Sequence, residues 1–497
     1  MLMRRALGIG IFAVLGLAAV AHADPAAPTA ASASAPPRSA VLPRLDPAKA
    51  QAAADGLKRA VGELGGTVGV YAIDLETARP VAAIDEATPR NPASNAKLAT
   101  AFAALDRLGP QHRFATGLYG TVDAKGTVPK LVLRGRGDPS LRDADLWDMA
   151  RELARSGVKR VDAIAIDQGA FGDRWVPPAF EQQPEEWAPF RANVAPLSID
   201  GNIVTLWIRA GASEGAPATV VIDPPGSVVL EGKVETGGAK SKESLRVELR
   251  VDRDRLIAKL GGSAPAGSRP IPVARRADDP RKLGALAMRE ALRAVGIAVG
   301  DAIELGGAGE THALVVHTSR PLGELLAMLG KESDNFAAEM VLLGLAPADA
   351  KATPEAGAAV VREVLEKRHA FDAGMRVING SGLFDANRSS PRAVASLLRS
   401  AWEDPRVGPD YVAQLAIGGV DGTLKNRFRD WADTRAIRAK TGTLAATVAL
   451  SGYVMRTSGQ RPIVFSVIVN DCKGKAPEAR NAIDTFVDGV ARAAWGR

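Results

Sequence analysis

The sequence contains a single cysteine, Cys472, among 497 residues. One thiol can form no disulfide within the chain and cannot supply a multi-cysteine zinc or iron–sulfur site. Histidine is scarce as well: the five histidines are scattered, and none belongs to the HExxH pattern of metalloproteases. The sequence thus lacks both kinds of metal-site pattern, and nothing else in it implies a metal ion or an organic cofactor.

Aromatic residues make up only 5% of the chain, and the 63 Lys and Arg residues are dispersed rather than gathered in a basic run. Nucleic-acid binding usually relies on basic clusters and on aromatic stacking surfaces. The net charge of +7 is therefore weak support for nucleic-acid binding. An anionic polymer such as a cell wall accounts for this charge equally well, and we predict no nucleic-acid partner.

Long hydrophobic runs are missing after residue 20, where no stretch of about 18 uncharged apolar residues occurs. The first 23 residues have the three-part layout of a secretory signal peptide: two arginines, a short apolar run, and a small-residue cleavage site ending at Ala23. We expect cleavage after Ala23, export to the periplasm and no stable transmembrane segment afterwards. Residues 24–43 are rich in Ala, Pro and Ser, and we expect an unstructured linker there.

The two ends of the remaining chain show regular hydrophobic periodicity. At the start we predict a helix over 46–64, strands over 67–75 and 80–84, and a helix opening at 92. At the end we predict strands over 436–441, 447–455 and 462–469 and a helix from 477. These ends are expected to share one antiparallel sheet flanked by helices, an α/β (α+β) fold built from residues 44–108 and 310–497.

The middle of the chain has a different pattern. Residues 109–309 hold many short strand-like runs, and a helix is expected around 280–295. The clearest of these runs are 131–133, 162–166, 203–208, 219–222 and 245–251. We therefore expect a large β-rich insertion that forms two domains.

Ser94 and Lys97 begin and end the sequence SNAK, an S-x-x-K motif at the start of an amphipathic helix. Residues three apart on a helix lie on one face, so the lysine can reach the serine. A desolvated lysine near another cation has a lowered pKa and can act as the base for a serine nucleophile. A second S-x-x-K, from Ser156 to Lys159, is interrupted by Gly157 and leads into a strand, where this geometry fails.

Ser333 and Asn335 belong to the sequence SDN, which precedes a helical run. From a loop, the hydroxyl could relay a proton and the carboxamide could bind a substrate amide. The alternative is a helix N-cap, for which all three residue types are suitable. The residues alone favour the N-cap.

Lys440, Thr441, Gly442 and Thr443 form the sequence KTGT at the end of a predicted strand. A lysine and hydroxyls on a strand edge can bind a carboxylate, and a glycine lets substrate approach the backbone. A strand terminus with a turn glycine explains the same residues.

In this order, S-x-x-K, S-D-N and K-T-G are the motifs of penicillin-binding proteins and serine β-lactamases. The chain resembles the low-molecular-mass class C penicillin-binding proteins, the DacB-like D-alanyl-D-alanine carboxypeptidases and endopeptidases. Ser94 and Ser333 lie 239 residues apart, and this branch holds inserted domains between these motifs. The matching stretches are NPASNAKLATAFAAL (91–105), GRGDPSL (135–141), KESDNFAAE (331–339), NGSGL (379–383), GVDGTL (419–424) and AKTGTL (439–444).

The resemblance implies a role for each motif residue. Ser94 would be the acylated nucleophile and Lys97 its general base. Ser333 would pass a proton to the leaving D-alanine, and Asn335 would hold the peptide. Backbone N–H groups of Ser94 and Thr443 would form the oxyanion hole. Lys440 would supply positive charge, while Thr441 and Thr443 would bind the terminal carboxylate.

The chain departs from the family at one place. The family often has SGLSR where this chain has SGLFD, so its arginine arrives only at Arg388. An arginine there would suit the side-chain carboxylate of diaminopimelate. Asp138 in GRGDPSL could meet an amine of the stem peptide, although an Asp-Pro turn is the alternative.

The resemblance predicts a serine peptidase that acts on peptidoglycan stem peptides and is covalently inhibited by β-lactam antibiotics. A β-lactamase is one alternative, and a catalytically silent wall-binding scaffold on the same fold is another. Slow release of a bound penicillin would separate the peptidase from the β-lactamase. The sequence leaves the oligomeric state open.

Overall fold

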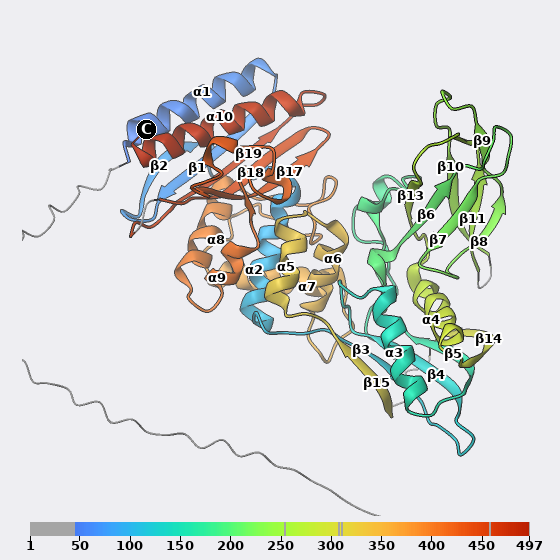
Figure 1. The fold of residues 1–497 in the computed structure, drawn as a ribbon. Coiled ribbons are helices and arrows are strands. Elements are labelled where there is room, and N and C mark those ends of the chain that lie inside the picture. Colours follow the sequence, from blue (N-terminus) through green and yellow to red (C-terminus); the bar gives the residue numbers. More distant parts are fainter. Residues whose placement is uncertain (1–44, 253–254, 307–308, 310–311, 457–458, 497) are drawn as a thin grey trace, which may run out of the picture. The chain divides into compact units, whose positions relative to one another are not determined.

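The computed structural model describes residues 45–496 apart from 253–254, 307–308, 310–311 and 457–458 (Figure 1). The predicted signal peptide and the predicted linker both lie outside these residues. Within the described ranges, no helix has the length and apolar character needed to cross a membrane.

A six-stranded antiparallel sheet joins the two ends of the chain in the order β16-β17-β18-β19-β1-β2. Every residue of β18 is buried, as expected for a strand that helices cover on both faces. The predicted antiparallel sheet with flanking helices is confirmed. Its strands are β1 (Thr67–Asp74), β2 (Arg79–Ile84), β16 (Ala416–Ile417), β17 (Ile437–Leu444), β18 (Thr447–Val454) and β19 (Ile463–Asn470).

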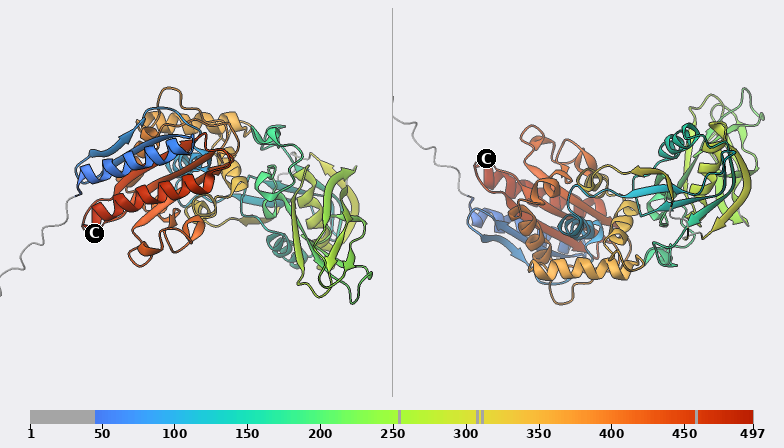
Figure 2. Two further views of the ribbon diagram at one scale, coloured as in Figure 1. Left: turned by 90° about the horizontal axis from the view of Figure 1, so that it is seen from above. Right: turned by 90° about the horizontal axis from the view of Figure 1, so that it is seen from below.

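Two layers of helices cover this sheet. On one face, α1 (Pro47–Glu63) and α10 (Ala476–Trp495) lie side by side and bury apolar side chains against it (Figures 1 and 2). A second apolar core fills the space between the other face and a helical cluster that contains the S-x-x-K helix α2. This cluster consists of α2 (Ala96–Leu108), α5 (Leu322–Gly330), α6 (Asn335–Gly344), α7 (Pro354–Lys367), α8 (Pro391–Glu403) and α9 (Gly408–Ala413).

The chain between α2 and α5 forms separate sheets. A five-stranded sheet has the order β14-β5-β4-β3-β15, and α3 (Asp143–Arg155) and α4 (Leu283–Ala294) share its apolar core. The boundary expected at residue 309 falls between β14 and β15, which are both strands of this sheet. The strands are β3 (Ala115–Tyr119), β4 (Thr127–Gly135), β5 (Arg160–Asp167), β14 (Ala298–Leu305) and β15 (Ala313–Thr318).

In the part of the middle region that the structure describes, eight more strands confirm its expected β-rich character. They form two three-stranded sheets, β13-β6-β7 and β10-β11-β8, and the pair β12-β9. These strands are β6 (Ile203–Arg209), β7 (Thr219–Asp223), β8 (Val229–Gly232), β9 (Glu235–Gly237), β10 (Arg246–Asp252), β11 (Arg255–Gly261), β12 (Ser263–Pro265) and β13 (Ile271–Arg276).

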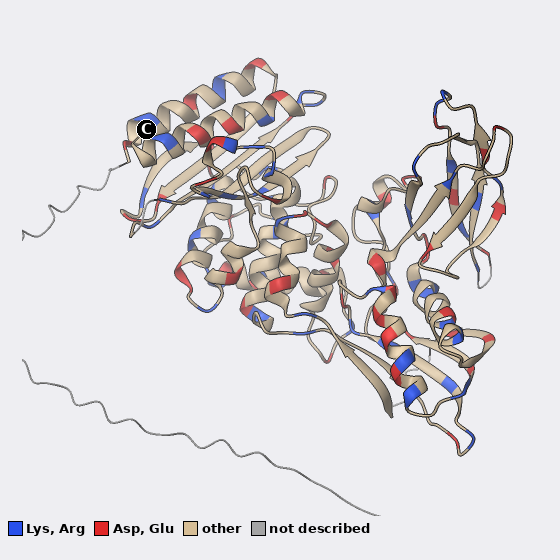
Figure 3. Cartoon of the chain, in the orientation of Figure 1, with Lys and Arg blue, Asp and Glu red and all other residues tan. Residues whose placement is uncertain are grey.

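Short 3₁₀ helices connect these elements, and three of them, η1, η2 and η3, contribute residues to the site described below. Charged residues of both signs are interspersed along the surface helices, most plainly on α3 and α4 (Figure 3). The 3₁₀ helices are η1 (Ala93–Asn95), η2 (Phe180–Gln182), η3 (Pro189–Arg191), η4 (Asp200–Asn202), η5 (Pro280–Lys282), η6 (Gly422–Leu424) and η7 (Arg429–Trp431).

Candidate active site

Ser94 lies in η1, the tight turn that leads into α2. The Asn91 side chain accepts the N–H of Ala93 at 2.9 Å and holds this residue at a φ of 46°. The buried Asn95 side chain donates to Ser451 Oγ on β18 at 2.8 Å. These hydrogen bonds fix the serine turn between the sheet and the helical cluster.

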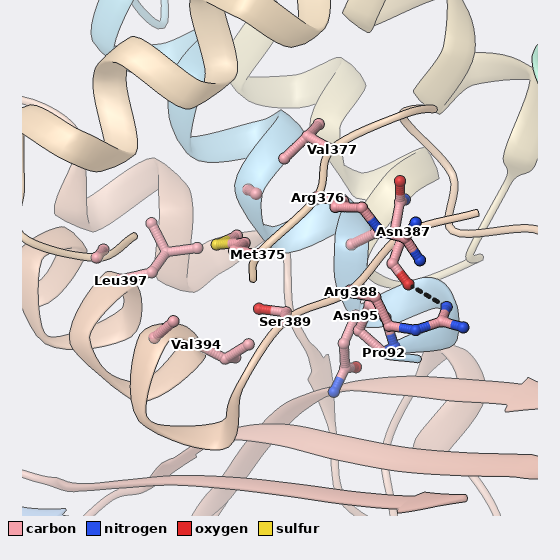
Figure 4. Close-up of a pocket in the computed structure, with 14 residues that line it drawn as sticks. Pro92, Asn95, Met375, Arg376, Val377, Asn387, Arg388, Ser389, Val394 and Leu397 are labelled. Carbon is pink, nitrogen blue, oxygen red and sulfur yellow. Dashed lines mark hydrogen bonds between the residues drawn. The ribbon is translucent and has the colours of Figure 1, made fainter. Parts of the chain in front are cut away.

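The back of this turn packs on the segment 375–389 and on α8 (Figure 4). The cavity left between them measures about 20 Å³, which is room for about one water molecule. The serine turn therefore has little room to shift toward α8.

Lys97 points from α2 to the serine, and its side chain is only 1% exposed. Its Nζ lies 3.1 Å from Ser94 Oγ, 2.7 Å from Asn335 Oδ1 and 2.8 Å from the carbonyl oxygen of Ser381. Burial lowers the pKa of Lys97 from its usual value to about 7, although nearby carboxylate charges oppose this shift. A substantial fraction of this amine is therefore neutral near pH 7.

The SDN segment combines both of the roles considered for it. Asp334 is the N-cap of α6 and accepts the N–H of Ala337 at 3.1 Å. Its neighbours Ser333 and Asn335 instead line the cleft. The cap and the functional placement are thus compatible, because different residues of the motif carry them.

Lys440 approaches Ser333 from the sheet. Its Nζ donates to Ser333 Oγ at 2.8 Å and to the carbonyl oxygen of Thr441 at 2.8 Å, and its side chain is fully buried. Burial, reinforced by the charge of Lys97, holds the pKa of Lys440 well below its usual value. Two lysines thus meet two serine hydroxyls in one buried centre.

The other residues of the KTGT sequence have different positions. Thr443 lines the cleft, whereas Thr441 Oγ1 lies 2.9 Å from Thr423 Oγ1 and is not among the residues that line it. Gly442 passes so close to the serine turn that a Cβ there would lie 2.9 Å from the carbonyl oxygen of Pro92. This close approach explains why the strand needs glycine at this position.

The structure does not bring Asp138 to the wall of the cleft. Its side chain is 2% exposed, and its Oδ1 accepts both the N–H and the hydroxyl of Ser140 at 2.8 and 2.7 Å. This is the geometry of the Asp-Pro turn that was the alternative for this residue.

The cleft has a volume of about 770 Å³ and opens directly onto Ser94. Arg388, the displaced arginine, lies in its wall and pairs with Asp385 at 2.5 Å. The second S-x-x-K does not form such an arrangement, because Ser156 is the C-cap of α3 and Lys159 is exposed. The lining residues are Asn91, Ser94, Gln182, Gln183, Phe190, Ser333, Asn335, Leu383, Phe384, Asp385, Arg388, Thr443, Leu444, Ala445, Ala446, Thr447, Asn470 and Asp471.

Two backbone groups complete the site and were not found from the sequence. The carbonyl oxygen of Ser381 accepts from Lys97, and the carbonyl oxygen of Phe190 accepts from Asn335 Nδ2 at 2.9 Å. Phe190 belongs to η3 and is 45% exposed. A residue from the long middle region thus orients the carboxamide of the SDN motif. Every residue has a backbone carbonyl oxygen, so residue types cannot show which of them act as acceptors. Only the resemblance at NGSGL indicated the segment that contains Ser381.

Comparison with known proteins identifies the group to which this arrangement belongs. Residues 51–490 match the D-Ala-D-Ala carboxypeptidase 3 (S13) family. The chain is 33% identical over 440 residues to a D-alanyl-D-alanine carboxypeptidase of Actinomadura sp. (strain R39), covering 84% of this chain and 80% of that protein. It is 24% identical over 425 residues to the D-alanyl-D-alanine carboxypeptidase DacB of Haemophilus influenzae, covering 82% and 86%.

The fold agrees with a solved structure of the same kind. The crystal structure of penicillin binding protein 4 (dacB) from Haemophilus influenzae superposes with a TM-score of 0.71 and 22% identity, covering 86% of this chain and 97% of that one. The predicted resemblance and fold class are confirmed. The chain belongs to the D-Ala-D-Ala carboxypeptidase 3 (S13) family of serine-type D-alanyl-D-alanine carboxypeptidases.

Proposed function

We propose that this D-alanyl-D-alanine carboxypeptidase acts through an acyl-enzyme on Ser94, with Lys97 as the general base. The observation that carries the proposal is the set of three contacts of Lys97 Nζ, with Ser94, Asn335 and Ser381, in a buried place. A neutral amine has two N–H groups and one lone pair. If the two N–H groups donate to Asn335 and Ser381, the lone pair is left for the Ser94 hydroxyl.

Acylation then follows from this arrangement. Ser94 Oγ attacks the carbonyl carbon of the penultimate D-Ala while its proton passes to Lys97. The developing oxyanion would be bound by the backbone N–H groups of Ser94 and Thr443, and one such donor typically contributes about 10²–10³ in rate. As the C–N bond breaks, the proton held by Lys97 passes to the leaving amine by way of the Ser333 hydroxyl, which Lys440 contacts at 2.8 Å, and Lys97 is neutral again.

Water then attacks the acyl carbon while one of its protons passes to Lys97, and Lys97 returns that proton to Ser94 Oγ as the ester C–O bond breaks. The second N–H of Asn335 Nδ2 is left to bind a substrate carbonyl, because Phe190 takes only one of the two. A substrate carboxylate would favour the protonated form of Lys440, and this ammonium and the Thr443 hydroxyl on the cleft wall would bind it. Thr441, whose Oγ1 lies 2.9 Å from Thr423 Oγ1, would have to turn toward the cleft to join them.

The substrates we propose are peptidoglycan stem peptides. Removal of the terminal D-Ala and cleavage of D-Ala–diaminopimelate cross-links require the same acyl-enzyme. β-Lactams would acylate Ser94 in the same way; a β-lactam complex of the penicillin binding protein 4 of Haemophilus influenzae supports this, at a TM-score of 0.68 and 23% identity. Signal cleavage after Ala23 would place the enzyme in the periplasm, where these peptides occur.

The reaction is tested by measuring free D-Ala released from a peptide that ends in D-Ala-D-Ala. We expect continuous release, and no release from the same peptide ending in D-Ala-L-Ala. With benzylpenicillin we expect about one equivalent to be consumed per enzyme, followed by very slow turnover. Rapid, continuous penicillin hydrolysis without D-Ala release would contradict the proposal and favour the β-lactamase.

Gly442→Ala is expected to slow acylation by benzylpenicillin by about 10- to 10²-fold. The added Cβ would lie 2.9 Å from the Pro92 carbonyl oxygen, so β17 and the serine turn must move apart by a few tenths of an ångström. The matched control is Gly62→Ala in α1, where a Cβ meets no atom within 4 Å. The control should acylate at the wild-type rate, and equal rates for both variants would contradict the close approach.

A further inference from the structure

Glu339 is a buried carboxylate one turn beyond Asn335 in α6, and its side chain is 2% exposed. A carboxylate in such a place is costly unless its oxygens accept hydrogen bonds. Glu339 Oε1 accepts the N–H of Ser381 at 2.8 Å, and Oε2 accepts the N–H of Gly380 at 3.0 Å. The two oxygens thus hold two consecutive backbone N–H groups of the NGSGL segment.

The backbone of Ser381 connects this carboxylate to Lys97. Its N–H binds Glu339, and its carbonyl oxygen accepts from Lys97 Nζ at 2.8 Å. The carbonyl oxygen of Gly380 is held as well, by the Thr100 hydroxyl of α2 at 2.9 Å. A movement of this segment therefore displaces an acceptor of Lys97.

The NGSGL segment is also packed against the serine turn. Gly382 has a φ of 76°, and a Cβ there would lie 1.9 Å from the carbonyl oxygen of Ala93. No side chain fits between the two segments. The position of Ser381 relative to Ser94 is thus determined by direct backbone packing on one side and by Glu339 on the other.

Helix α6 supplies one partner of Lys97 and holds another in place. Asn335 and Glu339 are four residues apart, so they lie on the same face of the helix. Asn335 accepts from Lys97 directly, whereas Glu339 acts through the Ser381 carbonyl oxygen.

We propose that Glu339 is a positioning residue for the general base: it holds the Ser381 carbonyl where it binds Lys97, so that the lone pair of the amine faces Ser94. This inference rests on the proposed function, because it takes Lys97 as the base. Glu339 does not line the cleft, so it acts on Lys97 only by holding Ser381 and through the charge of its own carboxylate.

A carboxylate suits this place better than a carboxamide. Two neighbouring N–H donors need two acceptor oxygens, whereas a glutamine offers one oxygen and would turn its own NH₂ group toward the second donor. The charged groups that face Lys97 are Glu339 and Asp334 on the α6 side and Lys440 on β17. The charge of Glu339 raises the pKa of Lys97 against the larger effect of burial.

The test is the rate constant for acylation by benzylpenicillin, measured as a function of pH in Glu339→Gln and in wild type. Neutral Lys97 is the active form, so the wild-type rate should rise with pH through a midpoint near 7. Glu339→Gln should be slower by about 10- to 10²-fold at the plateau, because Lys97 is misplaced. Its midpoint should also move to lower pH, because a charge that favours the ammonium is gone.

Two further variants separate position from charge. Glu339→Asp keeps the charge but has a shorter reach, so it should be slow with a midpoint near that of wild type. Glu355→Gln removes an exposed carboxylate at the start of α7 and should resemble wild type in rate and midpoint. Thermal unfolding of each variant reports whether it is folded.

A folded Glu339→Gln variant with a rate within about threefold of wild type, or a slower one with an unchanged midpoint, would overturn the proposal. If Glu339→Gln does not fold, Glu339→Asp decides: a rate within about threefold of wild type overturns it, and a slower rate with the wild-type midpoint supports it. Lys97→Arg distinguishes a failure of this inference from a failure of the proposed function. If that variant acylates normally, Lys97 is not the base and the proposed function itself fails.

Discussion

Replacing Ser94 with alanine is expected to lower D-Ala release on the order of 10⁶-fold, the scale typical for loss of an acyl-transfer nucleophile. The remaining groups of the site cannot form the ester, since Ser333 is already bound to Lys440 rather than to Lys97. The measurement is the turnover of a peptide ending in D-Ala-D-Ala by purified variant and wild type, with thermal unfolding to show that both are folded.

The chain offers a matched control for this variant. Ser156 begins the second S-x-x-K, and its hydroxyl only donates to the carbonyl oxygen of Leu153 at the end of α3. Ser156→Ala should retain wild-type turnover. If Ser94→Ala retains more than about a hundredth of wild-type turnover while folded, Ser94 is not the nucleophile.

Lys97→Arg is expected to reduce acylation by about 10²–10⁴-fold, the usual contribution of a general base. Arginine keeps the positive charge but remains protonated at every accessible pH, so it cannot accept the Ser94 proton. In wild type, acylation should fall as pH drops below about 7, because Lys97 becomes protonated. The variant should lack this dependence.

Lys159→Arg in the second S-x-x-K is the control, and it should leave both the rate and its pH profile unchanged. Lys159 is exposed, and Gly157 with a φ of 95° breaks the helical spacing before it. A Lys97→Arg variant that keeps the wild-type pH profile would show that another group accepts the proton.

The side chains of the centre could be predicted because short motifs carry them. Ser94 and Lys97 are three apart at a helix start, and a helix brings such residues together without long-range information. The contact of Ser333 with Lys440 spans 107 residues, and it was expected only because a family resemblance links the two motifs.

The backbone partners could not be predicted from residue types. The carbonyl oxygens of Ser381 and Phe190 act through their positions, which depend on packing across hundreds of residues. Thr441 and Asp138 illustrate the reverse case. Their residue types fit substrate binding, but in the structure the first faces Thr423 and the second is enclosed by its own turn.

The fold was predictable where periodicity was strong. The last three predicted strands correspond to β17, β18 and β19 within a few residues, and β18 and β19 are buried almost throughout, as their apolar runs suggested. The extent of the middle region was harder to define. β15 (Ala313–Thr318) is mostly solvent-facing and joins a sheet through β3, a pairing that no local pattern shows. The division of the chain into domains stays a prediction.

The most direct test of the proposed mechanism is the intact mass of the protein after incubation with benzylpenicillin, for wild type, Ser94→Ala and Ser156→Ala. We predict one penicilloyl adduct on wild type and on Ser156→Ala that persists for many minutes, maps to the peptide containing Ser94 and is absent from Ser94→Ala. An adduct that remains on folded Ser94→Ala, or no adduct on any of the three proteins, would contradict the acyl-enzyme on Ser94.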